Sequence, residues 1–155
     1  MQVPRACILA CAGRVVGMTV SEYLNENNRQ GNSRTVKLLG LQPGDRVLEI
    51  GFGNGRTVAD VLSQAANIRY TGIDISQTMV GEAARFNATL VAEGSAGFRL
   101  ASADHLPFSA AAFERAFSTG VIYFWDTPAR PFAEVRRVLS GRGMMIMSCR
   151  DNLTP

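Results

Sequence analysis

The feature that most constrains the fold is a short apolar segment that ends in a cluster of glycines. Residues 46–50 (RVLEI) have the composition of a buried strand, and residues 51–55 (GFGNG) place a glycine at every second position. A helical pattern follows, with apolar residues at Val58, Val61, Leu62 and Ala65. Where a strand turns through glycines into a helix, backbone amides lie unpaired at the positive end of the helix dipole. The segment therefore predicts an anion-binding turn within an α/β fold.

Strand and helix patterns alternate along the rest of the chain. Further strands are expected at residues 70–73, 97–101, 115–118 and 144–149, with a loop over 102–113 and a glycine turn over 140–143. Helices are expected at 15–28, at 34–39 with Ser33 as N-cap, from Ser76 to about Glu93, and after Thr127. The expected inner faces of the last two helices are Met79, Ala83, Phe86 and Leu90, and Phe132, Val135 and Leu139. This alternation predicts an α/β fold with a doubly wound, mostly parallel sheet.

Length and composition are those of a single globular domain. The chain has 155 residues, 46% of them hydrophobic and 19% charged, which is enough apolar side chain for a core without disulfides. No apolar run approaches the roughly 20 residues that span a bilayer. The net charge of +3 comes mostly from scattered arginines, so the sequence predicts neither a membrane span nor a nucleic-acid surface.

The cysteines and the N-terminal segment bear on compartment and domain boundaries. Cys7, Cys11 and Cys149 leave an odd thiol and match no zinc spacing, which favours reduced thiols, a cytoplasmic location and no metal site. Residues 1–17 are expected to be a poorly ordered lead-in, with a stunted signal peptide or lipoprotein signal as the alternative. Residues 18–155 are then expected to form one domain.

An acidic residue follows the glycine turn at the spacing that a ribose-binding carboxylate requires. Asp74 lies 19 residues after Gly55, at the expected end of the next strand, close to the spacing of about 20 for an acid that holds ribose hydroxyls. Turn and acid together predict a cofactor that contains adenosine. A nicotinamide-dependent oxidoreductase is an alternative, which Arg56 disfavours because it occupies the third glycine position of the dinucleotide pattern.

Four segments, which include the glycine turn and Asp74, give the chain a family resemblance. Residues 47–55 (VLEIGFGNG), 72–76 (GIDIS), 101–108 (ASADHLPF) and 134–139 (EVRRVL) stand in the order and spacing of class I (Rossmann-like) S-adenosylmethionine-dependent methyltransferases. The resemblance covers roughly residues 34–149 and is nearest to the group that includes quinone-biosynthesis and small-molecule methyltransferases. It implies a strand order of 3-2-1-4-5, S-adenosylmethionine as cofactor, and methyl transfer to an unidentified small-molecule acceptor.

The resemblance also implies roles for the residues of the turn. Gly51, Gly53 and Gly55 would approach the methionine part of the cofactor, and Phe52 and Asn54 would supply loop contacts. Glu49 would organise the turn, with an acid merely packed at a strand end as the alternative.

A second group of implied roles concerns the adenosine. Asp74 would accept the ribose hydroxyls, or else serve only to start a helix. The adenine would lie among residues of the next two motifs and near the end of the fourth strand, namely Ile75, Met79, Ser102, Ala103, Asp104 and, beside the methyl group, Ser118. Ser102 departs from the family pattern, because an acid usually stands at its position.

Catalytic residues cannot be assigned from motifs that describe only the cofactor. His105 is a candidate base, with a solvent-facing loop residue as the alternative, and Tyr123 is a candidate because residues 123–126 (YFWD) would border the acceptor pocket or pack as a lid.

The chain ends soon after the fifth strand, whereas the family usually carries two more strands. A truncated core is therefore expected, and a cofactor-binding but catalytically incompetent domain is the alternative function. The apolar fifth strand, residues 144–147 (MMIM), would form an exposed edge that associates with a second copy or a completing chain.

Overall fold

The computed structural model describes residues 32–149. Its strands are β1 (Arg46–Ile50), β2 (Arg69–Asp74), β3 (Ala96–Leu100), β4 (Phe113–Thr119) and β5 (Leu139–Ser148). Its helices are a first helix over 32–38, α3 (Val58–Leu62), α4 (Gln77–Phe86), α5 (Ala88–Ala92) and α6 (Ala129–Val138), with a 3-10 turn η2 (Ile122–Phe124). The expected lead-in at 1–17 and helix at 15–28 lie outside the described residues.

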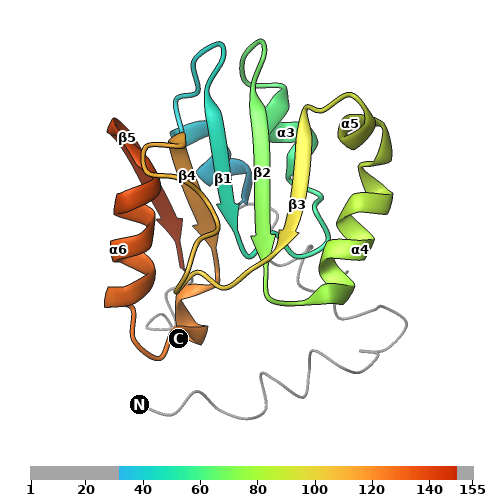
Figure 1. The fold of residues 1–155 in the computed structure, drawn as a ribbon. Helices are drawn as coiled ribbons and strands as arrows, with labels where there is room; N and C mark the ends of the chain where they lie inside the picture. Colours follow the sequence, from blue (N-terminus) through green and yellow to red (C-terminus); the bar gives the residue numbers. More distant parts are fainter. Residues whose placement is uncertain (1–31, 150–155) are drawn as a thin grey trace, which may run out of the picture.

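The strands form one sheet in the order β3-β2-β1-β4-β5, with every neighbouring pair parallel. The predicted fold class and strand order are thus confirmed. All strand arrows point to the lower edge of the sheet in Figure 1. The carboxyl ends of β1, β2 and β4 therefore meet there, and the glycine turn, Asp74 and η2 share that edge.

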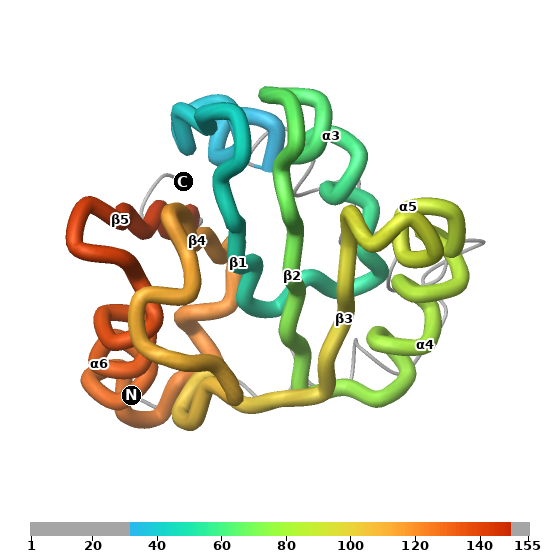
Figure 2. The backbone as a smooth tube through the Cα atoms, turned by 45° about the horizontal axis from the view of Figure 1, so that its top comes forward, coloured from blue at the N-terminus to red at the C-terminus, as the bar shows by residue number. Residues whose placement is uncertain are grey.

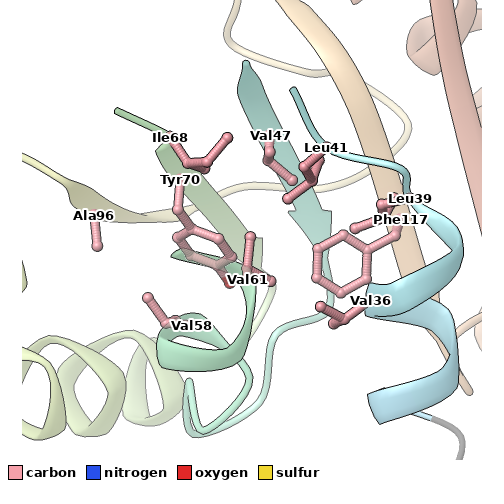
Figure 3. Packing of buried hydrophobic residues seen from close by; sticks show 10 residues of the cluster. All are labelled: Val36, Leu39, Leu41, Val47, Val58, Val61, Ile68, Tyr70, Ala96 and Phe117. Carbon is pink, nitrogen blue, oxygen red and sulfur yellow. The ribbon is translucent and has the colours of Figure 1, made fainter. Parts of the chain in front are cut away.

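Alternating residues of β1 supply two separate cores, one on each face of the sheet. Val47 packs with residues of the first helix and α3, and the labelled side chains of this cluster are shown in Figure 3. Leu48 packs in the second cluster with Val135 and Val138 of α6. Figure 2 shows α4 and α5 beside β3 at one side of the molecule and α6 at the other. No helix within residues 32–149 is long and apolar enough to cross a membrane.

The expected helix from Ser76 to Glu93 is divided into α4 and α5 at Asn87. Ser76 caps it as predicted, accepting a hydrogen bond from the Met79 amide at 3.4 Å. Ala83 is buried, but Phe86 is 60% exposed, so its assignment to the inner face was wrong. The buried Asn87 side chain donates to the carbonyls of Gly55 and Ala83 and occupies the inner position at the break.

Three other local predictions need correction. Ser33 lies inside the first helix rather than at its N-cap. The inner face of α6 consists of Pro131, Val135 and Val138, while Phe132 is 43% exposed with its ring edge-on to Trp125. Leu139 is buried but belongs to β5.

The expected glycine turn over 140–143 is instead part of β5, where the register against β4 shifts between Phe113 and Arg115. A Cβ at Gly143 would lie 3.0 Å from the backbone of Ser140, a tight contact that favours glycine at this irregularity. β5 forms one edge of the five-stranded sheet, with Met144 41% exposed and Ile146 packed against the core. Association through this edge stays a prediction.

Candidate cofactor site

The turn after β1 is built from three glycines in the left-handed region. Gly51, Gly53 and Gly55 have φ values of 74°, 59° and 73°. A Cβ at Gly51 would overlap Cγ2 of Val121, and one at Gly55 would lie 2.8 Å from the Cβ of Ala83. No atom lies within 4 Å of a Cβ placed on Gly53. The turn is therefore tightly packed at both ends and open in the middle, as a backbone cradle for a ligand would be.

Asp74 joins this turn to the start of α4. Its Oδ2 accepts a hydrogen bond from the Gly53 amide at 3.1 Å, and its Oδ1 accepts one from the Ser76 amide at 2.9 Å. Beside it, Ile75 is 76% exposed and Met79 is half-buried. Asp74 thus connects the glycine turn to the start of α4, with one apolar side chain exposed beside it.

Glu49 is buried beneath the turn. Its Oε2 accepts hydrogen bonds from the hydroxyl of Tyr70 at 2.6 Å and from that of Thr57 at 2.7 Å. Burial raises the pKa of Glu49 to about 7, even though these two hydrogen bonds lower it, and the charge of Asp74 adds to the rise. Through these hydrogen bonds Glu49 links the end of β1 to Tyr70 of β2 and to Thr57, the N-cap residue of α3.

The raised pKa predicts that this chain becomes less stable between mildly acidic and neutral pH. Glu49 holds its proton to about pH 7 when folded but releases it near 4.5 when unfolded. The unfolded state binds fewer protons over this interval, so the free energy of unfolding falls as pH rises through it, by on the order of 3 kcal/mol from this group. Urea unfolding of wild type and Glu49→Gln, at a series of pH values, should show the fall only in wild type. Parallel curves would contradict the prediction.

The segment after β3 lies beside Asp74. The Ala101 amide donates to the Asp74 carbonyl at 3.0 Å. In the tight turn that follows, the Ser102 hydroxyl accepts from the Asp104 amide at 3.2 Å. Ser102, Asp104 and His105 are exposed, while Ala103 is buried in the second core. The structure thus places polar side chains of this segment at the same edge of the sheet as Asp74.

Two predicted residues turn their side chains into the protein. The hydroxyl of Ser118 is fully buried and donates to the Ile50 carbonyl at 2.9 Å. The ring of Phe52 is 5% exposed and packs edge-on against Phe98, with centroids 5.0 Å apart. Neither side chain is therefore available to a ligand, and Ser118 is 0% exposed as a whole residue. Asn54 is half-buried, and Tyr123 in η2 is 38% exposed.

Three residues of the site were not predicted from the sequence, namely Thr57, Tyr70 and Asn87. Tyr70 reaches Glu49 across Gly72, where a Cβ would lie 2.9 Å from the Tyr70 hydroxyl. Asn87 carries a signal that could have been found, because it stands four residues after Ala83 on an otherwise apolar face. A polar residue there must find partners, and Asn87 finds the Gly55 carbonyl at 3.0 Å.

A parallel 3-2-1-4-5 sheet with a glycine turn after β1 and an acid at the end of β2 defines a Rossmann-like class of protein. The sequence of residues 48–147 matches the family described as "Methyltransferase domain". The chain belongs to this family.

Individual relatives agree with this assignment. The uncharacterized methyltransferase YdaC of Bacillus subtilis is 27% identical over 138 residues, which cover 86% of this chain and 73% of YdaC. The malonyl-[acyl-carrier protein] O-methyltransferase of Geobacter sulfurreducens is 30% identical over 105 residues, 68% of this chain and 38% of that enzyme. The structure of a SAM-dependent methyltransferase from Aquifex aeolicus has a TM-score of 0.68 at 18% identity, with 87% of this chain and 76% of that one covered. The chain therefore spans well under half of the Geobacter enzyme.

Proposed function

We propose that the chain binds S-adenosylmethionine over the carboxyl ends of β1, β2 and β4 and transfers its methyl group to a small-molecule acceptor. The observation that carries this proposal is the conformation of Gly53. Its φ lies in the left-handed region, no atom lies within 4 Å of a Cβ placed on it, and its amide donates a hydrogen bond to Asp74. Backbone without a side chain, next to a carboxylate, suits a ligand with an amino-acid part and a ribose. Membership of the methyltransferase domain family supports the same cofactor.

Asp74 retains capacity for the ribose hydroxyls. A carboxylate has about four lone-pair sites, and the Gly53 and Ser76 amides each take one, on different oxygens. One site on each oxygen is left for two neighbouring hydroxyls. In this arrangement Ile75 and Met79 would flank the adenine, and Ser102, Ala103 and Asp104 would meet its edge.

The chemistry requires little from the protein beyond binding and orientation. S-adenosylmethionine supplies a methyl group on a positively charged sulfur, ready for displacement. The backbone from Gly51 to Gly55 would hold the methionine part, and the residues after β4 would orient the acceptor. His105 and Tyr123 stay candidates for a base.

The cytoplasmic location stays a prediction, with which the exposed free thiol of Cys149 is compatible.

Two observations bear on the nature of the acceptor. Tyr123 and Phe124 of η2 are 38% and 50% exposed and follow the end of β4, where an acceptor would approach. The Geobacter relative is named for methylation of an oxygen. The exposed aromatic rings support an acceptor that is partly apolar, and the name of the Geobacter relative supports an oxygen as the atom that is methylated.

Transfer of a labelled methyl group tests the proposal and separates it from its alternative. The chain is incubated with S-adenosylmethionine labelled in the methyl group and with a small-molecule extract. We expect the label to move to an extract component, and to stay on the cofactor when Asp74→Ala replaces the wild type. Tight binding of the cofactor without any transfer would instead favour a cofactor-binding domain that lacks catalysis.

A further inference from the structure

One ion pair fastens the segment after β3 to α6. Arg137 donates to the Leu106 carbonyl at 2.9 Å and to the Phe108 carbonyl at 2.7 Å. Glu134 accepts the Leu106 amide at 2.7 Å. The two side chains also pair with each other through two hydrogen bonds of 2.8 Å. We call this arrangement of Glu134 and Arg137 the clamp.

Glu134 and Arg137 form hydrogen bonds with backbone groups of Leu106 and Phe108 as well as with each other. An exposed ion pair alone contributes little, but here it satisfies both the amide and the carbonyl of Leu106, whose side chain is 2% exposed. The Ala111 amide adds a hydrogen bond to the Arg137 carbonyl at 3.1 Å. The hydrogen bonds from Arg137 and from the Leu106 amide lower the pKa of Glu134 to about 2, so the clamp stays charged at ordinary pH.

The segment that the clamp holds at Leu106 is also hydrogen-bonded at its other end, Ala101, beside the proposed cofactor site. Ala101 is hydrogen-bonded to the carbonyl of Asp74, and Leu106 is held by α6. Figure 2 shows the segment running from the end of β3 along this edge of the sheet toward α6. The turn at 102–104 lies between the two anchors, so its position depends on both.

We propose that the clamp positions the turn at 102–104 against the adenine of the cofactor, which makes Glu134 and Arg137 positioning residues for cofactor affinity. This inference rests on the proposed function. The described hydrogen bonds of Ser102 are all local: its hydroxyl bonds to Asp104, and its carbonyl accepts from the His105 amide at 3.2 Å. The packing of Ala103 in the second core and the two anchors together keep the backbone of Ala103 and the side chains of Ser102 and Asp104 in place.

Calorimetric titration with S-adenosylmethionine tests the inference on Arg137→Met. The matched control is Arg46→Met, since Arg46 forms the same kind of ion pair with Glu114 at 2.7 Å and also donates to a carbonyl, that of Ala111, at 3.2 Å. Arg46 begins β1, at the opposite edge of the sheet. We expect Arg137→Met to raise Kd about tenfold with unchanged stoichiometry. Arg46→Met should leave Kd near the wild-type value.

A purely structural role would produce a different pattern. It would lower the binding stoichiometry through unfolded protein and leave the Kd of the folded fraction unchanged, and this result would overturn the inference. Equal effects of the two substitutions on Kd would also overturn it. If Arg137→Met does not fold, Glu134→Gln replaces it, because an amide oxygen can still accept from Leu106. Absence of binding by the wild type overturns the proposed function itself.

Discussion

Replacement of Asp74 by alanine is expected to weaken binding of S-adenosylmethionine by about 100-fold or more. Hydrogen bonds to a charged group contribute about 1.5–3 kcal/mol each, and the proposed site loses two of them to the ribose. The Gly53 amide also loses its anchor, since Asp74 Oδ2 is the group that accepts from it. Each 1.4 kcal/mol is a factor of about ten in Kd. Titration calorimetry of both proteins at one pH measures the change.

Two substitutions control for general effects of removing charge. Asp74→Asn keeps the size of the side chain and one oxygen acceptor, so its affinity should fall between those of wild type and Asp74→Ala. Asp60→Ala removes an exposed carboxylate from the first turn of α3 and should bind as wild type does. Wild-type affinity in Asp74→Ala would show that the carboxylate does not hold the cofactor.

Replacement of Gly55 by alanine is expected to destabilise the chain by about 3 kcal/mol. The left-handed backbone, with φ of 73°, disfavours alanine by about 1–2 kcal/mol. The new methyl group would also lie 2.8 Å from the Cβ of Ala83 and from Nδ2 of Asn87. Overpacking of this kind costs about 1–3 kcal/mol, and it displaces the hydrogen bond from Asn87 to the Gly55 carbonyl.

Gly94→Ala is the matched control for this substitution. Gly94 has the same φ of 73°, but no atom lies within 4 Å of a Cβ placed there. It should therefore show only the backbone effect, about 1–2 kcal/mol. Urea unfolding gives both values, and equal destabilisation in the two variants would mean that α4 moves away from the turn without cost.

Most of the fold was predictable because it depends on short, repeated patterns. Buried strands with glycine turns after them, such as residues 46–55, require only local composition to be found. Strand order followed from the family resemblance and was confirmed. The errors concern helix faces, where one polar residue changes the packing. Asn87 divides α4 from α5, and Phe86 then faces solvent under the guanidinium of Arg56, 5.2 Å from its ring centroid.

The site was predictable in its backbone and less so in its side chains. The glycines and Asp74 could be predicted because the residue types and their spacing along the chain are enough to identify them. Thr57 and Tyr70 could not, because their hydroxyls meet Glu49 only after β1 and β2 pair. Likewise, the buried donation from Ser118 to Ile50 needs the pairing of β4 with β1, which local spacing does not reveal.

The turn and Asp74 are proposed to hold S-adenosylmethionine rather than a nicotinamide dinucleotide. Calorimetric titration of the wild-type chain with S-adenosylmethionine, S-adenosylhomocysteine and NADH tests it directly. Saturable binding of the first two at one site, with no heat from NADH, is the predicted result. Binding of NADH alone would contradict the account.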